Sequence, residues 1–506
     1  MALSRTSSAL NSALASGLWL AGRAVAGAAP PLALVDKHSL ETVAEVPTAS
    51  ADQIASAVTA GVTEGKPAMA SLPLAARRDV LNAASGALAA ARDDFASALM
   101  IEAGKTADAA RGEIDRAVAT FRLCADAVGS SRSLEEAGRL GAHPSGAGYE
   151  YVRRPFPIGL ISAIAPFNFP VNLAVHKIGP AIAAGCPVIL KPSPATPATA
   201  LMLGKILADA GLADVPGSFS ILPAHDDDAP LFTSSPGIDC ISFTGSPKVG
   251  WGIKASAPGA GRTKVVLELG GNAAAIVDAG ADVAAATSAI ARAGFGQAGQ
   301  SCISVQNVFL HSSIAPAATD ALTTAVAALP RGDPAEPGVV CAPMISPAAA
   351  AALADKISDA LARPGFSALV GGDRPQQGSN VVSPTLIAAP PSTTDAFDAP
   401  LCAEEAFGPV VILHTFDDLD AVFDTINAGP FGLQTGIFTP SLAAAHRAFN
   451  KLDMGGVVIN DVPTTRMDAM PYGGVKDSGE GFEGPTYAID EFSVPRLMLI
   501  NTGSLL

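Results

Sequence analysis

The sequence predicts an α/β fold in which helices cover both faces of parallel β-sheets. From Gly159 onward, apolar strand-like runs alternate with helix-like runs: "GLISAIAP", "NLAVHKIGPAIAAG", "CPVILKPS" and "ATALMLGKILADAG", with later strands at "FSILPA", "IDCISFTGS" and "TKVVLELGG". A second block with similar alternation begins near Ala273 and extends to about Lys476. Strands separated by helices usually pair in parallel, so each block predicts one helix-covered sheet.

The N-terminal residues allow two interpretations. The run "LWLAGRAV" has the apolar character of a strand, which would leave residues 1–16 as a short N-terminal tail. The stretch before Asp36 contains arginine, serine and alanine but no acidic residue, a composition also found in mitochondrial and plastid transit peptides. We favour the strand, and with it a cytoplasmic protein, over import into a mitochondrion or plastid.

The next elements are helices followed by an extended arm. Residues 50–128 carry alanine and leucine at helical spacing with scattered charges. Residues 131–157 are irregular until "GYEYVRRPFPIG", which has the pattern of an extended hairpin arm. The C-terminal "GPTYAIDEFSVPRLMLI" ends in a strand that could pair with this arm.

Composition and charge limit the classes of function. A chain of 506 residues, 49 % hydrophobic and 16 % charged, can form two or three domains with a large core. The net charge of −15 disfavours nucleic acid and anionic membranes as partners, and no apolar run makes a convincing transmembrane helix. Six scattered cysteines without a CxxC pair or a Cys/His cluster argue against a disulfide framework and a bound metal, and favour a reducing compartment.

Cys302 lies between a turn of small residues and a predicted buried strand, in "FGQAGQSCISVQNVFL". A single cysteine is most often a small buried side chain. A cysteine next to such a turn can also be displayed as a nucleophile. The residue alone leaves both interpretations open.

Two segments could approach a phosphorylated ligand. Lys191 ends the predicted strand of "VILKPS", and ligands of open α/β sheets bind at the carboxyl ends of strands. The segment "SFTGSPKVG" follows a strand and should open a helix, whose N-terminus could receive a phosphate. An ordinary surface lysine and an ordinary tight turn are the alternatives.

Two other side chains could take part in acid–base or oxyanion chemistry. Glu268 lies in "VVLELGG", where apolar surroundings should raise its pKa toward that of a general base. Asn168 lies in "APFNFPVNL" just before a helix, where its amide could stabilise an oxyanion. A hydrogen-bonded structural glutamate and a helix-capping asparagine are the alternatives.

Together these segments resemble the aldehyde dehydrogenase superfamily. The motifs "LELGGN" and "FGQAGQSC" are specific to it, and "HKIGPAIAAG", "EEAFGPV" and "PYGGVKDSG" support them. The resemblance runs from about Leu18 to the last strand, and it departs from the usual pattern at Ser304 and Gln306, neither of which removes a group that the chemistry needs. It implies two Rossmann-like domains with parallel sheets, a small β oligomerisation arm, and a homodimer or homotetramer. The implied division is 17–138 and 156–271 for the coenzyme-binding domain, 272–478 for the catalytic domain, and 139–155 with 485–506 for the arm.

The resemblance also assigns the chemistry. Cys302 would attack the aldehyde carbon, the Asn168 amide and the Cys302 N–H would hold the oxyanion, and NAD(P) would accept the hydride. Glu268 would then activate the water that hydrolyses the thioester. The implied coenzyme-binding residues are Pro166, Phe167, Lys191, Ser193, Phe243, Gly245, Ser246, Val249, Leu269, Glu405 and Phe407.

The coenzyme is expected to be NADP rather than NAD. Relatives that prefer NAD often place a glutamate three residues after the strand-end lysine, where this chain has Pro194. No carboxylate there repels a 2′-phosphate, and Ser193 can donate a hydrogen bond to one. By the same resemblance, Lys191 and Glu405 would hold the two riboses and Ser246 the pyrophosphate.

Two arginines suggest an anionic substrate. Arg116 in "GEIDRAVATF" lies on a helix that lines the aldehyde tunnel in relatives, and Arg466 in "DVPTTRMDAMPYGG" lies on the loop that closes it. If the two converge, they can bind one anion bidentately; the alternative is two surface arginines in ion pairs. Phe169, His176 and Ser301 complete the implied substrate site.

The substrate assignment follows a closer resemblance. These motifs resemble family 21 aldehyde dehydrogenases of lower plants and related bacterial enzymes, which implies NADP-linked oxidation of succinate semialdehyde. The alternatives are non-phosphorylating oxidation of glyceraldehyde 3-phosphate, whose enzymes carry an arginine where this chain has Ser301, and a broad-specificity aldehyde dehydrogenase. An inactive structural relative would be expected to lack Cys302 or Glu268, and a CoA-acylating enzyme commonly lacks the glutamate; both residues are present.

Overall fold

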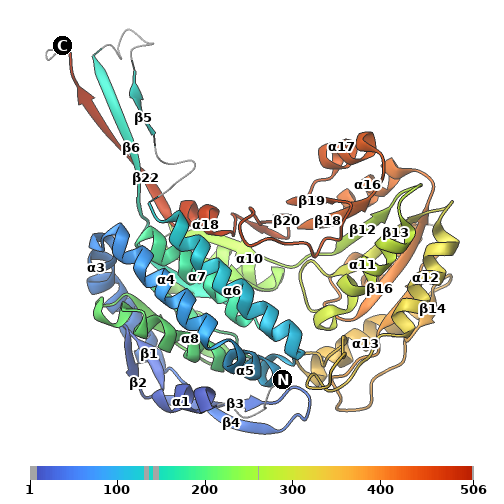
Figure 1. Cartoon of the computed structure of the whole chain (residues 1–506), viewed down its shortest axis with the longest axis horizontal. Helices are drawn as coiled ribbons and strands as arrows, with labels where there is room; N and C mark the ends of the chain where they lie inside the picture. The colour runs from blue at the N-terminus through green and yellow to red at the C-terminus, as the bar shows by residue number, and fades with distance from the viewer. Residues whose placement is uncertain (1–7, 130–135, 141–147, 260, 392, 504–506) are drawn as a thin grey trace.

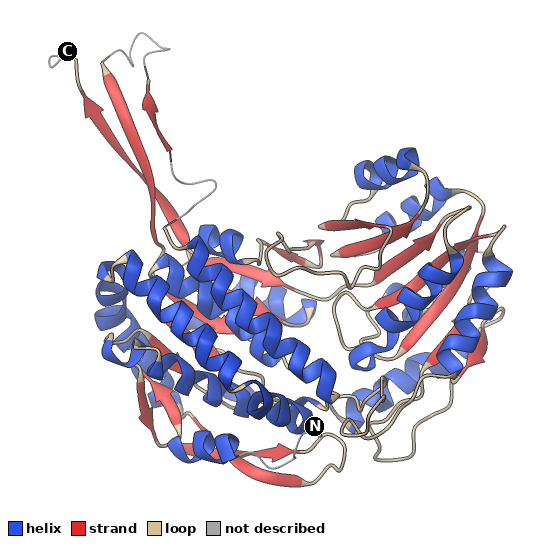
Figure 2. Ribbon diagram, in the orientation of Figure 1, coloured by secondary structure: helices blue, strands red, loops and turns tan. Residues whose placement is uncertain are grey.

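Two α/β lobes and a projecting β-ribbon make up the chain (Figure 1). The computed structural model describes residues 8–129, 136–140, 148–259, 261–391 and 393–503. Both lobes combine helices with a sheet, whereas the projecting arm consists of strands (Figure 2). The predicted fold class is therefore confirmed.

The first sheet contains the strands predicted after Gly159. Its central strands pair in parallel, and antiparallel strands are added at both edges. The spatial order is β2 (Arg23–Val25), β1 (Leu18–Leu20), β9 (Phe219–Ile221), β8 (Val188–Lys191), β7 (Leu160–Ile164), β10 (Ile238–Thr244), β11 (Lys264–Glu268) and β21 (Gly479–Glu480).

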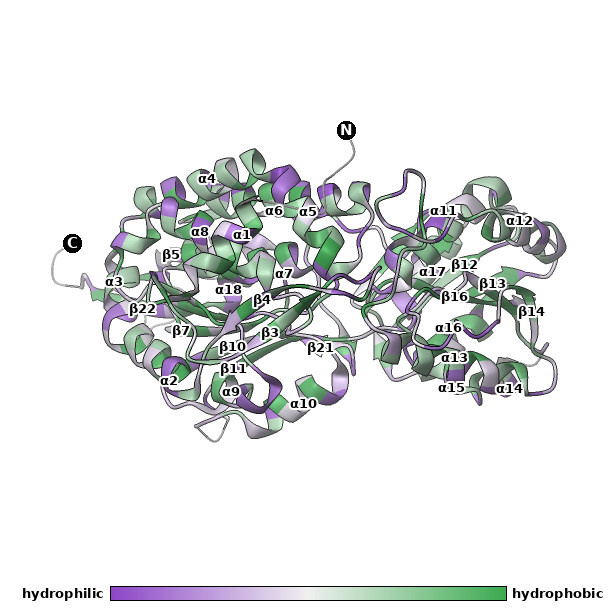
Figure 3. Cartoon of the chain, turned by 90° about the horizontal axis from the view of Figure 1, so that it is seen from below, coloured by the Kyte–Doolittle hydropathy of each residue, from purple (hydrophilic) through white to green (hydrophobic). Residues whose placement is uncertain are grey.

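Helices cover both faces of this sheet because the apolar strands are buried on both sides. One layer contains α4, α5, α6 and α8, and the layer on the opposite face contains α2, α9 and α10 (Figure 3). The bounds are α2 (Ala51–Ala60), α4 (Leu74–Ala90), α5 (Arg92–Ala103), α6 (Ala107–Ala127), α7 (Pro170–Ala184), α8 (Ala198–Asp209), α9 (Leu231–Ser234) and α10 (Pro247–Ser256).

The second lobe has its own sheet, parallel except at its β14 edge. The spatial order is β14 (Ser367–Val370), β15 (Thr385–Ala388), β16 (Val410–Phe416), β13 (Val305–His311), β12 (Ala273–Val277), β18 (Gln434–Phe438) and β19 (Gly456–Ile459). Its helices include α11 (Val283–Phe295), α12 (Ala315–Ala327), α13 (Pro347–Leu361), α16 (Leu419–Ala428) and α17 (Leu442–Lys451).

The predicted pairing of the C-terminal strand with the arm is confirmed. Strand β22 (Ser493–Asn501) pairs antiparallel with β6 (Tyr149–Pro157), which in turn pairs with β5 (Glu136–Arg139). The expected start of the C-terminal arm segment at residue 485 needs correction, because α18 (Pro485–Glu491) packs on α7 and α6 of the first lobe. Parts of the expected arm, residues 141–147 and 504–506, lie outside the described residues.

The N-terminal segment also differs from the expectation of a simple tail. Residues 8–16 form helix α1 (Ser8–Ser16), which packs on α8 and buries Leu10 and Ala13. The apolar face of this helix explains why it is folded onto the lobe. The segment "LWLAGRAV" is a hairpin of β1 and β2 rather than one strand, and residues 1–7 lie outside the described residues.

This topology brings three of the predicted functional residues to one edge of the first sheet. Lys191 is the last residue of β8, Glu268 is the last of β11, and Asn168 lies between β7 and α7. The carboxyl ends of parallel strands share one edge, where ligands of open α/β sheets bind. Over the described residues, no helix is long and apolar enough to cross a membrane.

Candidate active site

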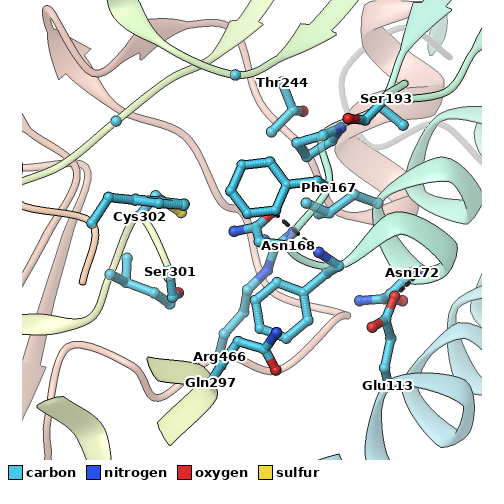
Figure 4. A pocket seen from close by; sticks show the side chains of 18 of the residues that line it. Glu113, Phe167, Asn168, Asn172, Ser193, Thr244, Gln297, Ser301, Cys302 and Arg466 are labelled. Atoms are coloured by element: carbon cyan, nitrogen blue, oxygen red, sulfur yellow. Dashed lines mark hydrogen bonds between the residues drawn. The ribbon is translucent and has the colours of Figure 1, made fainter. Parts of the chain in front are cut away.

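A cavity of about 760 Å³ opens at this edge, and residues of both lobes line it. Figure 4 shows Cys302 and Ser301 on one side of it, facing Asn168 and Phe167. Most of the residues predicted from the sequence line this cavity: Arg116, Pro166, Phe167, Asn168, Phe169, Lys191, Ser193, Phe243, Gly245, Ser246, Leu269, Ser301, Cys302, Glu405, Phe407 and Arg466.

Three predicted residues do not line the cavity. Glu268 is buried directly before the lining residue Leu269. Val249 is half exposed on α10. His176, expected to contact substrate, is fully buried on α7, where its Nε2 lies 2.8 Å from the Asp468 carboxylate. His176 therefore does not contact the cavity itself; it holds the Asp468 side chain in position.

A tight turn places Cys302 at the cavity. The 3-10 turn Gly296–Gly299 follows α11 and has left-handed backbone angles at Gln297 (φ 55°) and Ala298 (φ 52°). Gly299 has a φ of 67°, and a Cβ there would lie 2.1 Å from the Gly408 carbonyl oxygen, so glycine is required. The small residues of "GQAGQS" thus allow the chain to turn in a confined space.

The Cys302 thiol is hydrogen-bonded to a side chain of the cavity wall. Its Sγ lies 3.0 Å from the Tyr472 hydroxyl. Removal from water raises the pKa of Cys302 to about 11; the Tyr472 hydrogen bond opposes this shift, whereas the Glu405 and Glu268 carboxylates add to it. The sulfur therefore lies among carboxylates that disfavour the thiolate, and the Tyr472 hydroxyl favours it.

Asn168 lies within reach of the loop that carries Cys302. Its Nδ2 donates to the Gln300 carbonyl at 3.1 Å, and its Oδ1 accepts from the Phe169 backbone N–H at 3.1 Å. These bonds fix the amide plane at the cavity wall. The second Nδ2 hydrogen remains available to a ligand oxygen, because a primary amide has two donors.

Glu268 has the environment that the sequence predicted. Its side chain is buried, and within the described residues neither carboxylate oxygen has a hydrogen-bond partner. Burial raises its pKa well above the usual range, and the nearby Glu483 carboxylate adds to the shift. A carboxylate with a raised pKa is a stronger base than an ordinary glutamate, as a general base requires.

Glu483 is a second buried carboxylate, which the sequence analysis did not identify. Its side chain accepts from Lys177 Nζ at 3.1 Å and from Arg466 Nη2 at 3.1 Å. Burial opposes ionisation, but these two cations lower the pKa of Glu483 to about 2. The two neighbouring glutamates thus have opposite pKa shifts, so Glu483 is ionised where Glu268 can hold a proton.

The two predicted substrate arginines both line the cavity, but each already binds a carboxylate. Arg116 donates from Nε and Nη2 to Asp468 at 3.0 and 2.7 Å. The Arg466 side chain is 7 % exposed, binds Glu483, and lies 3.7 Å from the centroid of the Tyr472 ring. Both arginines thus line the cavity and are ion-paired, but Arg466 is not the surface residue of the alternative interpretation, and binding of one anion by the two stays a prediction.

Arg292 is a further cavity arginine that the sequence analysis missed. It lies on α11, ten residues before Cys302, and its Nη1 donates to Ser288 Oγ at 2.7 Å. Its side chain is exposed. No motif marks this position, although the helix that leads into the Cys302 turn could have been searched for a cation.

The part of the cavity where the sequence predicted a coenzyme has polar groups at strand and helix ends. Lys191 Nζ is 3.4 Å from the exposed Asp226 carboxylate, and Ser193 lies two residues further on. Helix α10 begins after Ser246 without a side-chain cap, so its first N–H groups are available to an anion. Glu405 accepts from the Gly271 N–H at 3.0 Å, and burial raises its pKa to about 7.

A model of the aldehyde dehydrogenase family matches residues 25–497. The chain is 35 % identical over 483 residues to the 3-sulfolactaldehyde dehydrogenase of Priestia aryabhattai, covering 94 % of this chain and 95 % of that protein. It resembles the crystal structure of aldehyde dehydrogenase 21 from Physcomitrella patens with the product succinate, at a TM-score of 0.90 and 37 % identity, covering 97 % and 98 % of the two chains. It also resembles glyceraldehyde-3-phosphate dehydrogenase GapN from Methanocaldococcus jannaschii with NADP, at a TM-score of 0.86 and 31 % identity, covering 94 % and 100 %.

The chain belongs to the aldehyde dehydrogenase family. It is an NAD(P)-dependent aldehyde dehydrogenase, as the resemblance of its motifs predicted. The likeness to family 21 is confirmed as well.

Proposed function

We propose that the enzyme oxidises a small aldehyde with an anionic far end to the carboxylic acid, with succinate semialdehyde as the foremost substrate. The observation that carries this proposal is that Arg116, Arg292 and Arg466 line the same cavity as Cys302. Arg116 uses two N–H groups on Asp468 and retains three. The buried Nε of Arg466 has no partner within the described residues.

In the proposed reaction, the Cys302 sulfur attacks the aldehyde carbon and forms a thiohemiacetal. The oxygen of this adduct accepts hydrogen bonds from Asn168 Nδ2 and the Cys302 backbone N–H. NAD(P), when bound, supplies the hydride acceptor. Glu268 then takes a proton from the water that attacks the thioester, which releases the acid and restores Cys302.

The residues around the coenzyme half fit a dinucleotide. The uncapped N-terminus of α10 would receive the pyrophosphate, and Lys191 and Glu405 would hold the riboses. Gly270 allows the close approach to Glu405, since a Cβ there would lie 2.3 Å from its carboxylate. NADP is favoured because Pro194 lines the cavity where a glutamate would repel the 2′-phosphate, and GapN of M. jannaschii was crystallised with NADP.

Three similar proteins support an anionic substrate. Aldehyde dehydrogenase 21 holds succinate, and the other two are named for 3-sulfolactaldehyde and glyceraldehyde 3-phosphate. Carboxylate, sulfonate and phosphate share the negative charge that an arginine can bind. Succinate semialdehyde is favoured because the motifs resemble those of family 21, and because Ser301 stands where the phosphate-specific enzymes carry an arginine.

We also propose that the enzyme forms a homodimer or homotetramer through its arm. The β22 strand exposes Leu497, Met498, Leu499 and Ile500, and the second lobe exposes Phe449. Exposed apolar surface favours association, and so does the position of β22 at the edge of the arm sheet, as far as the residues described there extend. Replacing Leu497 and Leu499 by aspartate should produce monomers in light scattering, and an unchanged mass would contradict this role of the arm.

All six cysteines are free, which fits a reducing compartment such as the cytoplasm.

A substrate panel tests the proposed function. We compare kcat/KM, with NADP and with NAD, for three anionic aldehydes and two uncharged ones. The anionic aldehydes are succinate semialdehyde, 3-sulfolactaldehyde and glyceraldehyde 3-phosphate, and the uncharged ones are lactaldehyde and butanal. The proposal expects the highest kcat/KM for succinate semialdehyde with NADP, and an absolute dependence on Cys302. A preference for butanal or lactaldehyde would contradict the anionic substrate.

A further inference from the structure

The Tyr472 hydroxyl contacts the atom that the proposed function assigns as the nucleophile. The oxygen lies 3.0 Å from Cys302 Sγ, within reach of a sulfur hydrogen bond. The Tyr472 side chain is buried beside Ile303, Leu433 and Met470. A buried hydroxyl needs a hydrogen-bonding partner, and here the sulfur supplies it.

Tyr472 is held in place through Glu483. The backbone N–H of each residue donates to the carbonyl of the other, at 3.1 and 2.6 Å. The Glu483 side chain also binds Arg466, whose guanidinium lies 3.7 Å from the centroid of the Tyr472 ring. Glu483 therefore fixes both the backbone of Tyr472 and the cation that covers its ring.

Because of the charged groups around the Cys302 sulfur, a hydrogen-bond donor is needed to stabilise the thiolate. Glu268 and Glu405 disfavour a negative charge on Cys302, and Arg466 favours one. A thiolate has no hydrogen, so in the reactive state only the phenol can donate between the two atoms. The stacked Arg466 cation withdraws electron density from the ring, which strengthens the phenol as a donor.

We propose that Tyr472 is a catalytic residue that donates a hydrogen bond to the Cys302 thiolate and so increases the fraction of enzyme in the reactive state. The inference rests on the proposed role of Cys302. The phenol keeps its proton throughout, and the thiol proton passes to solvent. A more stable thiolate is also a weaker nucleophile, with a Brønsted slope of about 0.4–0.5. A tenfold gain in thiolate therefore becomes roughly a threefold gain in rate below the thiol pKa.

The test is Tyr472→Phe in the full-length enzyme, with Tyr151→Phe on the arm as the matched control. Pulses of iodoacetamide across the alkaline range, with the Cys302 peptide quantified by mass spectrometry, give the pH profile of thiolate formation. Loss of one charge-assisted hydrogen bond should move the bend of this profile to a pH about one unit higher, because the thiolate becomes less stable. Alkylation near neutral pH should fall roughly threefold, and kcat/KM should fall similarly for charged and uncharged aldehydes.

A second variant is expected to act in the opposite direction. Incorporation of 3-fluorotyrosine at position 472 makes the phenol more acidic and a better donor, so alkylation near neutral pH should become faster. If the alkylation rate bends at the same pH in the wild type and in every variant, the inference is overturned. This holds even if the alkylation rates of the variants differ from that of the wild type by a constant factor. Cys302→Ser tests the proposed function separately: an inactive Cys302→Ser enzyme with an unshifted Tyr472→Phe profile would reject only the role of Tyr472.

Discussion

Arg116 gives the sharpest test of how the cavity recognises charge. Arg116→Gln keeps a polar side chain on α6 but removes the cation. One charge-assisted hydrogen bond contributes about 1.5–3 kcal/mol. The Arg116 side chain is 32 % exposed, so the lower value applies. About 1.5 kcal/mol corresponds to a loss of roughly tenfold in kcat/KM for succinate semialdehyde, whereas butanal should be oxidised almost as well as before.

The ion pair with Asp468 adds a second effect. Without Arg116, the Asp468 carboxylate still binds His176 and Asn172, but its charge would now repel an anionic substrate. The double variant Arg116→Gln/Asp468→Asn should therefore recover part of the lost kcat/KM. Arg122→Gln, an exposed change on the same helix, serves as the control. Steady-state kinetics on both aldehydes decide the matter: equal losses on the charged and uncharged substrates would refute charge reading by Arg116.

Further predictions concern Glu268 and the coenzyme. Glu268→Gln should release NADPH in a single burst followed by slow turnover, because the thioester forms but its hydrolysis lacks the base; a rapid-mixing trace without a burst would count against this. The same variant should gain stability over the wild type as pH rises. Burial raises the pKa of Glu268, so the folded state favours the proton and loses stability as pH rises from the unfolded-state pKa toward the raised folded-state pKa. Urea unfolding of both proteins at a series of pH values above the unfolded-state pKa should show a difference in unfolding free energy that widens as pH rises, and a constant difference would disprove it. Pro194→Glu should lower the NADP/NAD ratio of kcat/KM by roughly tenfold, equal to about 1.4 kcal/mol of repulsion, and an unchanged ratio would reject the proposed 2′-phosphate site.

The sequence predicted most of the fold because hydrophobic periodicity directly reflects burial. The strands and helices after Gly159 carry that pattern clearly, and their alternation left a parallel sheet as the expected arrangement. The first residues were harder to interpret. Helix α1 is short and rich in alanine and serine, so only its packing on α8 shows that residues 8–16 are not a tail.

The site was predicted less completely, for a different physical reason. Strand-end residues such as Lys191 and Glu268 have positions that topology fixes. The ion pair between Arg116 and Asp468 joins residues 352 positions apart, and its partner lies in a loop without periodicity. The sequence pattern around each residue does not predict a contact between residues so far apart. The hydrogen bond between Tyr472 and Cys302 could not be predicted for the same reason.

The nucleophilic role of Cys302 is tested by the mass of the Cys302 peptide during turnover. Glu268→Gln is mixed with NADP and succinate semialdehyde, quenched in acid and digested. If Cys302 is the nucleophile, a succinyl adduct should appear on the Cys302 peptide together with one equivalent of NADPH per site, and it should be absent from Cys302→Ala. NADPH formation without an adduct, or an adduct on another cysteine, would contradict the assignment of Cys302 as the nucleophile.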